Sequence, residues 1–371
     1  MQNKPQSSTP SESKELLRKI VFLPLSKLYG FGTSFRNKLF DWGIKKETEF
    51  KIPIIVVGNL SVGGTGKTPH VEHIVNILRE NYNVGILSRG YKRETKGFIA
   101  ATPHSTPRDI GDEAYQMYHK FGRKIMVAVC EKRVLGIQKM MEINPQLNML
   151  VLDDAFQHRY VKPKVSILLT EFQKPYYEDH ILPYGRLRES TKNASRADIV
   201  IVTKCPPSLT PLDYRIKKKY LDLIPDQDLF FTRLQYELPR PVFPSAIKAN
   251  RILNLDTLRP EDHILIVCGI GNPKPFVRFI KSFGTQTLIN VFADHHEFTR
   301  KDMETLQSRF ETMPTGRRYV VTTEKDAVRL VNNPYFPHKL KPYIYFIPVH
   351  IAVDEIDNAD FERSLMKFIN L

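Results

Sequence analysis

Several scarcities in this sequence exclude whole classes of protein. It holds three cysteines, Cys130, Cys205 and Cys268, and their wide separation matches neither a disulfide framework nor a metal-ligand spacing. We therefore expect unpaired thiols in a reducing compartment. No run of 18 or more apolar residues occurs, so no membrane-spanning helix is predicted. No repeat of solenoid period is found.

The remaining composition is that of a globular protein with an excess of positive charge. The chain has 371 residues, of which 42% are apolar, and this length suits two domains. Lys and Arg number 55 against 40 Asp and Glu, a net charge of +15. Such a charge favours a polyanionic partner: a nucleic acid, an anionic membrane surface or a phosphorylated substrate. Charge alone does not choose among them.

The N-terminal region divides into two segments. Residues 1–13 are rich in Ser, Pro and Gln and lack the ordered regions of a signal peptide, so we predict a disordered tail. Residues 14–50 mix Lys and Arg with a helical apolar stripe, and Pro24 predicts a break between two short helical segments. Two interpretations stay open: a segment lying in a membrane interface, or a helix packed on the core. We predict an amphipathic, membrane-associating segment.

A phosphate-binding loop follows. The buried-strand pattern Ile54 to Val57 leads into a glycine-rich turn, and a helical apolar pattern comes after it. Backbone N–H groups of such a turn and the helix N-terminus bind phosphate. The residues predicted to bind ATP are Ser61, Val62, Gly63, Gly64, Thr65, Gly66, Lys67 and Thr68.

Within this loop, Lys67 is expected to reach the β- and γ-phosphates and Thr68 to ligate Mg²⁺. The loop departs from the general pattern at Ser61, where the first glycine usually stands. We expect Gly63 and Gly64 to supply the positive φ that the turn needs. A plain strand-to-helix turn is the alternative.

Carboxylates at a second strand end complete the predicted nucleotide site. Residues 148–152 form an apolar run that ends at Asp153 and Asp154, and Mg²⁺ is commonly held by one or two carboxylates together with phosphate oxygens. Farther on, Arg188 is a candidate phosphate contact and Glu189 a candidate metal contact. Ordinary surface positions are the alternative for both.

Two further loops offer substrate contacts. Arg89, Tyr91 and Arg93 follow the strand pattern of residues 84–87, where a cationic cluster suits a second anionic group, although a solvated basic loop is equally expected. Asp112 precedes an amphipathic stretch. It is either a helix N-cap or a carboxylate that faces the phosphate site.

Alternating strand and helix patterns predict an α/β fold. We expect a P-loop NTPase-type, mostly parallel sheet flanked by helices over residues 51–228. A second, smaller α/β domain with hinge strands is expected over residues 229–353, in which residues 343–353 return beside residues 229–238. A C-terminal helix is predicted over residues 354–371.

With these segments in place, the chain resembles the tetraacyldisaccharide 4'-kinase (lipid A 4'-kinase) family. The motifs that carry the resemblance are VVGNLSVGGTGKTP, LSRGYKR, GDE, LDDAFQHR, LPYGRLRE, GIGNP, FADHHEFT and TTEKDAVRL. The resemblance implies phosphorylation of the 4'-hydroxyl of a tetraacyldisaccharide 1-phosphate by ATP and Mg²⁺, at the cytoplasmic face of the inner membrane. Local departures are Ala155, Tyr184 and Arg186, which replace residues usual in the family.

The resemblance also implies residue roles. Asp112 and His295 would form the pair that activates the acceptor hydroxyl, and we expect domain closure to bring them together. Lys67 keeps the role given above. Asp153, Asp154 and Glu189 would serve the metal and its surroundings.

Two other functions remain as alternatives. One is a P-loop NTPase switch or metallochaperone-type protein that acts on a protein partner. The other is a nucleic-acid-binding ATPase, which charge alone suggests and for which no recognisable module is found. The preferred partners are the lipid disaccharide substrate and an anionic membrane surface, with no nucleic acid and no obligate protein partner.

Overall fold

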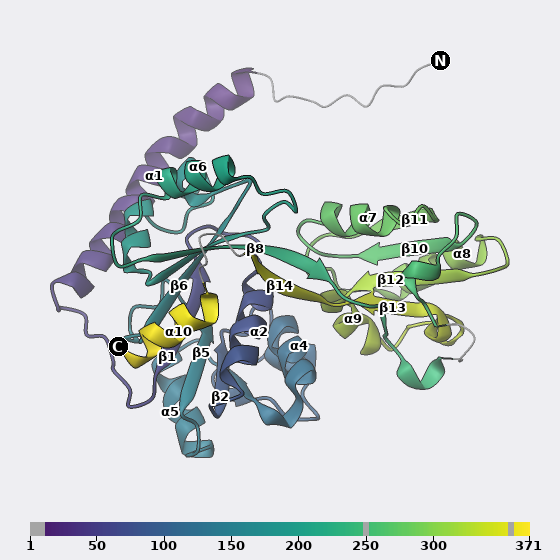
Figure 1. Cartoon of the computed structure of the whole chain (residues 1–371), viewed down its shortest axis with the longest axis horizontal. Coiled ribbons are helices and arrows are strands. Elements are labelled where there is room, and N and C mark those ends of the chain that lie inside the picture. The colour runs from purple at the N-terminus through teal and green to yellow at the C-terminus, as the bar shows by residue number, and fades with distance from the viewer. Residues whose placement is uncertain (1–11, 248–251, 355–359) are drawn as a thin grey trace.

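Two β-sheets organise the part of the chain that the computed structural model describes, residues 12–247, 252–354 and 360–371. The large sheet and its helices form one half of the molecule and the small sheet the other, and two long strands run between them (Figure 1).

The large sheet has nine strands in the described part of the chain. In spatial order they are β14 (Val349–Asp354), β8 (Asp228–Tyr236), β7 (Ile199–Thr203), β6 (Val165–Glu171), β1 (Ile54–Asn59), β5 (Met149–Asp153), β2 (Val84–Ser88), β4 (Met126–Val129) and β3 (Ile99–Ala100). All neighbouring pairs are parallel except the antiparallel pairs at the two edges, β14 with β8 and β3 with β4. The predicted mostly parallel P-loop-type sheet is confirmed.

Helices cover both faces of this sheet, which explains the unbroken apolar runs of its strands. Because successive side chains of a strand point to opposite faces, Ile55 and Val57 enter one core while Ile54 and Val56 enter the other. The first core is closed by α2 (Lys67–Leu78), α4 (Asp112–Phe121) and α10 (Phe361–Asn370), and the second by α5 (Arg133–Ile143) and α6 (Pro211–Leu221).

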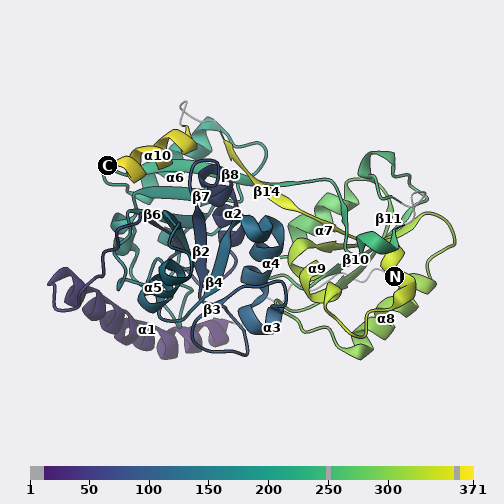
Figure 2. The same ribbon diagram turned by 90° about the horizontal axis from the view of Figure 1, so that it is seen from below.

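The small sheet repeats this layering. Its described strands are, in order, β11 (Gln286–Val291), β10 (His263–Cys268), β12 (Arg318–Thr323), β13 (Ile344–Ile347) and β9 (Arg240–Pro241). The helices around it are α7 (Lys274–Lys281), α8 (Arg300–Glu311) and α9 (Glu324–Val331). Between the two sheets, α4 of the large half lies against α9 of the small half (Figure 2).

The predicted return strand over residues 343–353 is wrong as a single element. It is split into β13, which pairs with β12 in the small sheet, and β14, which pairs antiparallel with β8 in the large sheet. Pro348 separates the two strands, because proline has no N–H with which to continue a ladder. Asp354, expected in the C-terminal helix segment, ends β14 instead, and that helix begins at Phe361.

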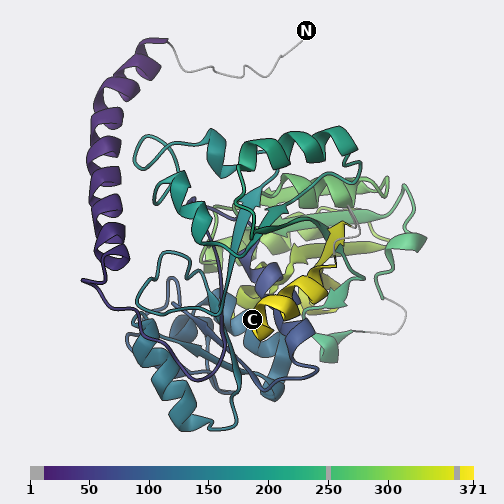
Figure 3. The same cartoon turned by 60° about the vertical axis from the view of Figure 1, so that its left-hand side comes forward.

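The N-terminal segment forms one long helix, α1 (Glu12–Asp41), that projects beyond the body of the molecule (Figure 3). The predicted break at Pro24 is wrong, because Pro24 lies inside this continuous helix. Just after it, Ser26 Oγ donates to the carbonyl of Ile181, 2.9 Å away, and joins the helix to the protein. The predicted tail lies outside the described residues up to position 11, and its last two residues belong to α1. No described helix combines the length and apolarity needed to cross a membrane.

Candidate active site

The phosphate loop joins β1 to α2, as the sequence predicts. The positive φ expected at Gly63 and Gly64 is found at Gly63, with φ +121°, and at Gly66, the residue before α2, with φ +86°, but not at Gly64. Ser61 instead forms an antiparallel bridge with Leu187, and Val62 N–H donates to the carbonyl of Arg186 at 2.7 Å. Extended backbone accepts any residue, which explains why serine replaces the usual glycine.

Hydrogen bonds from residues at and near β7 and β8 hold the phosphate loop in place. Thr203 Oγ1 donates to the carbonyl of Thr65 at 2.9 Å, and Lys204 bonds the carbonyl of Gly64. His70 on α2 lies 2.7 Å from the carbonyl of Gly66 and 2.9 Å from Thr232 Oγ1 on β8. Burial lowers the pKa of His70 to about 4, so the imidazole is neutral at pH 7. Nothing in the sequence motif singled out His70.

Lys67 and the two aspartates meet at the open end of the loop. Lys67 Nζ lies 3.4 Å from Asn59 Oδ1 and 3.6 Å from Asp154 Oδ1. Thr68 follows Lys67 in the first turn of α2. The sequence therefore correctly predicted that residues of β1, α2 and the end of β5 share one place.

The two aspartates differ sharply in environment. Burial, together with the charges of Glu113 and Asp154, raises the pKa of Asp153 to about 7. Asp154 is half-buried, and the positive charges of Lys67 and Arg188 outweigh this partial burial and lower its pKa. Arg188 NH1 lies 3.0 Å from Asp154 Oδ1, so the predicted phosphate-contacting arginine does reach this site.

Unsatisfied polar atoms show that this place suits a phosphate and a hard cation. Asp153 Oδ1, Asn59 Nδ2 and Thr65 Oγ1 are buried and have no hydrogen-bond partner among the described residues. Buried polar groups are rarely left unpaired, so a missing partner indicates a ligand position. The described residues hold no cluster of three or more His, Cys, Asp or Glu able to bind a metal.

The predicted metal contact of Glu189 is not what the geometry supports. This carboxylate is buried and accepts hydrogen bonds from Asn37 at 2.9 Å, Asn193 at 2.7 Å and Gln157 at 3.0 Å. It also forms an ion pair with Arg196 at 2.8 Å. Its oxygens are thus used within the protein, where they tie α1 to the loop that carries Arg188.

Asp112 and His295 lie side by side, as expected from the resemblance. Asp112 Oδ2 is 3.0 Å from His295 Nδ1 and 2.6 Å from Arg329 NH2. Burial opposes ionisation of Asp112, but the hydrogen bonds from His295 and Arg329 prevail and lower its pKa to about 2. The pair is already in contact in this structure, so the expected domain closure is not needed to form it.

The opposite nitrogen of His295 faces a second cation. Lys325 Nζ lies 2.9 Å from His295 Nε2 and 3.8 Å from Glu113 Oε1. Glu113 is in turn close enough to Asp153 to raise its pKa. The consecutive residues Asp112 and Glu113 of α4 therefore connect the histidine of the small half with the buried aspartate of the large half.

The predicted basic loop contributes unequally. The ring of Tyr91 packs edge-on against the ring of His295, with the centroids 5.3 Å apart. Arg89 is exposed in the same loop. Arg93 is not available to a substrate, because its side chain is only 2% exposed and pairs with Glu131 at 2.6 Å.

Sequence reasoning missed Arg329 and Lys325. Both stand in the motif TTEKDAVRL, which supports the resemblance, and they are one helical turn apart on α9. That i, i+4 spacing of two cations places them on one face of the helix and was a usable signal.

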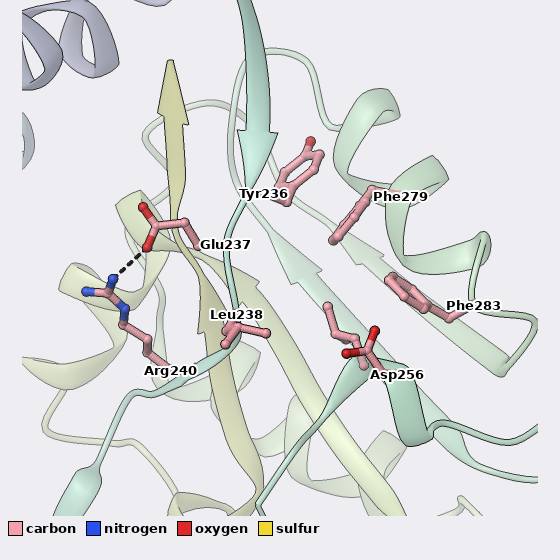
Figure 4. A pocket seen from close by; sticks show the side chains of 8 residues that line it. Tyr236, Glu237, Leu238, Arg240, Asp256, Phe279 and Phe283 are labelled. Carbon is pink, nitrogen blue, oxygen red and sulfur yellow. Dashed lines mark hydrogen bonds and ion pairs between the residues drawn. The ribbon is translucent and has the colours of Figure 1, made fainter. Parts of the chain in front are cut away.

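A separate open pocket of about 610 Å³ lies beside the end of β8 (Figure 4). Aromatic rings dominate it: Tyr236 stacks on Phe279 at 4.1 Å, and Phe283 lies next to them. Its Glu237 and Arg240 pair with each other at 2.5 Å. None of the groups at the phosphate loop or around His295 lines this pocket, so the chemistry belongs elsewhere.

Comparisons with known proteins show the family of this chain. A family model described as tetraacyldisaccharide-1-P 4'-kinase matches residues 18–370. The tetraacyldisaccharide 4'-kinase of Bacteroides thetaiotaomicron is 45% identical over 351 residues, covering 93% of this chain and 92% of the relative. That of Flavobacterium johnsoniae is 40% identical over 354 residues, covering 95% and 98%.

A solved structure extends the likeness to three dimensions. The crystal structure of "apo" form LpxK from Aquifex aeolicus in complex with ATP aligns with a TM-score of 0.71 at 25% identity, covering 95% of this chain and 99% of that chain. These matches do not favour a nucleotide switch or a metallochaperone-type protein. The chain therefore belongs to the tetraacyldisaccharide 4'-kinase family, and it is an ATP-dependent kinase of lipid A biosynthesis.

Proposed function

We propose that His295 accepts the proton of the acceptor 4'-hydroxyl while the hydroxyl oxygen attacks the γ-phosphorus of ATP. The O–H bond breaks, an O–P bond forms, and the bond to the β-phosphate oxygen breaks to release ADP. The observation that carries this proposal is the pair of contacts from His295 to Lys325 and from Lys325 to Glu113, whose charge acts on the buried Asp153.

The low pKa of Asp112 favours His295 as the base. A carboxylate with a pKa of about 2 is a weak proton acceptor, whereas it is well suited to accept the Nδ1–H of the imidazole. That hydrogen bond leaves the lone pair of Nε2 for the substrate hydroxyl. Lys325 occupies Nε2 in this structure, so we propose that it moves aside when the acceptor arrives.

At the phosphate loop, the residues would bind and orient the nucleotide. The amides of residues 61–68 and Lys67 would hold the phosphates, and Arg188 would add positive charge beside Asp154. Thr68, Asp153 and Asp154 would hold Mg²⁺, which supplies neutralisation of the phosphate charge when bound. Arg89 and Tyr91 are proposed to contact the acceptor, because Tyr91 adjoins His295.

Residues 51–228 and 229–353 are proposed to act as two domains, with β8 and β14, which pair at the edge of the large sheet, as the hinge. These strands support that role because they are the antiparallel pair through which the chain enters and leaves the small half. Movement about the pair would place the acceptor between His295 and the nucleotide.

Helix α1 supports membrane association because it exposes large apolar side chains on the face that points away from the protein. The residues that face the protein include the small or polar Ser26, Gly30 and Asn37, together with Phe40. Large apolar side chains are exposed on the same helix: Leu28 is 70% exposed and Phe31 71%. Such an apolar face, flanked by Lys and Arg, suits a helix lying in a membrane interface. We therefore propose a peripheral or monotopic enzyme at the cytoplasmic face of the inner membrane, with no obligate protein partner.

Product analysis tests the reaction. Full-length protein, Mg-ATP and tetraacyldisaccharide 1-phosphate in detergent micelles should yield a lipid heavier by one phosphate, and fragmentation should place that phosphate on the 4' position. Lys67→Ala should abolish this product. ATP consumption that yields no phosphorylated lipid, or that needs an added protein, would refute the proposal.

A further inference from the structure

A second amphiphilic surface lies on α6. Leu212, Ile216 and Tyr220 follow one another at intervals of four residues and are 65%, 42% and 58% exposed. The opposite side of the helix faces the core, where Leu221 is buried and the ring of Tyr214 contacts that of Phe231 at 5.0 Å. The exposed apolar stripe thus points away from the body of the protein.

Positive charge surrounds this stripe. Arg215, Lys217, Lys218 and Lys219 stand on α6, whereas its one carboxylate, Asp213, is engaged by Thr210 at the helix N-terminus. Lys217 lies over the rings of Phe172 and Tyr177 at 4.9 Å and 5.7 Å. Basic side chains around an apolar stripe fit the headgroups and acyl chains of an anionic bilayer.

The position of α6 also matches that of α1. Helix α6 lies at the end of the molecule beyond which α1 projects (Figures 1 and 3). One loop contacts both helices: its Tyr177 stacks on Tyr220 of α6 at 5.8 Å, and its Ile181 carbonyl accepts a hydrogen bond from Ser26 of α1. Helix α5, in contrast, lies at the opposite end (Figure 1).

We infer that α6 is a second membrane-contacting element that lies on the anionic bilayer surface into which α1 inserts. This inference rests on the proposed membrane association of α1. A protein that contacts a bilayer through one helix can still rotate about that helix, whereas contact through both α1 and α6 fixes its tilt. The large half is therefore held in one orientation relative to the lipid surface.

Site-specific tryptophan fluorescence tests this inference directly. Trp42 is the only tryptophan of the chain, so Trp42→Phe gives a silent background. Single probes are then placed by Tyr220→Trp on α6, Leu28→Trp on α1 and, as a matched control, Ile143→Trp at the exposed end of α5. Each full-length variant is mixed with vesicles of phosphatidylcholine and phosphatidylglycerol that carry brominated acyl chains.

We expect quenching and a blue shift at positions 28 and 220 and none at 143. Quenching at 28 alone overturns the inference and leaves the proposed function intact. Quenching at neither position refutes both, and equal quenching at all three indicates non-specific adsorption and also overturns the inference. Removal of two charges by Lys218→Gln and Lys219→Gln should weaken binding to the anionic vesicles at least about fivefold. Unchanged binding would contradict the anionic preference.

Discussion

The carboxylate of Asp112 and the imidazole of His295 are 183 positions apart in the sequence and 3.0 Å apart in the structure. Asp112 begins α4 of the large half, and His295 follows β11 in the small half with a positive φ of 58°. The contact orients the imidazole so that Nε2 faces away from the carboxylate. Because the two residues belong to different halves, the contact forms only when the two halves are correctly positioned relative to each other.

Substitution of either member of this pair should reduce turnover without preventing ATP binding. We expect Asp112→Asn and His295→Gln each to lower kcat by about 10²–10⁴-fold, the range of general base catalysis. The double variant should lose little more than either single one, because the two residues act as a unit. Losses well below tenfold in both single variants, measured at saturating ATP, would contradict the assignment.

Arg329 should set the pH range in which Asp112 is ionised. Its guanidinium lies 2.6 Å from Asp112 Oδ2 and helps to hold the pKa near 2. Loss of a neighbouring cation raises a carboxyl pKa, so Arg329→Gln should move the acidic limb of the kcat/KM profile to higher pH. Arg329→Lys should restore most of the original profile. An acidic limb unchanged in Arg329→Gln would show that Arg329 only supports the fold.

Magnesium dependence should follow the ionisation of Asp153. Since its pKa is raised to about 7, protons compete with the cation for this carboxylate as the pH falls below that value. The Mg²⁺ concentration for half-maximal activity should therefore rise from pH 8 to pH 6. Asp153→Asn should need more Mg²⁺ at every pH and lose this dependence. A wild-type Mg²⁺ requirement that stays constant over this range would argue against Asp153 as a ligand.

His70 should make the protein less stable in mild acid. Its pKa is about 4 in the folded chain and about 6.5 when unfolded, so the unfolded state binds the extra proton between these values. The contribution of neutral His70 to the free energy of unfolding is fully present above pH 6.5. It decreases as the pH drops toward 4, by about 3 kcal/mol at most. Urea unfolding at pH 7 and pH 5 measures how much the free energy of unfolding falls between these pH values, and this fall should be smaller in His70→Gln than in wild type. An equal fall in both proteins would exclude His70 as a cause of the acid sensitivity.

Glu189 should matter for stability more than for the metal. It is buried, and it joins Asn37 of α1 to Gln157 and Arg196. Glu189→Ala leaves Arg196 without its partner and should cost on the order of 3–5 kcal/mol in unfolding free energy. The Mg²⁺ requirement of the folded fraction should be unchanged. A large rise in that requirement with normal stability would restore Glu189 as a metal ligand.

The sequence predicted the large sheet because its strands are apolar on both faces and its phosphate loop is marked by glycine, lysine and threonine. It did not predict the division of residues 343–353, because both β13 and β14 have strand-like composition and only their partners differ. The same limit applies to Glu189, whose role depends on Asn37, a residue 152 positions away. The i, i+4 spacing of Lys325 and Arg329 marked one face of a helix, but it did not show that Arg329 pairs with Asp112, a residue 217 positions away.

Placement of the acceptor beside His295 tests the account most directly. A crystal structure of the full chain with Mg²⁺, a non-hydrolysable ATP analogue and tetraacyldisaccharide 1-phosphate would locate both substrates. We predict the phosphates in the loop before Lys67 and the 4'-oxygen within about 3.2 Å of His295 Nε2, with Lys325 displaced. Nucleotide bound elsewhere, or a 4'-oxygen remote from His295, would contradict the account.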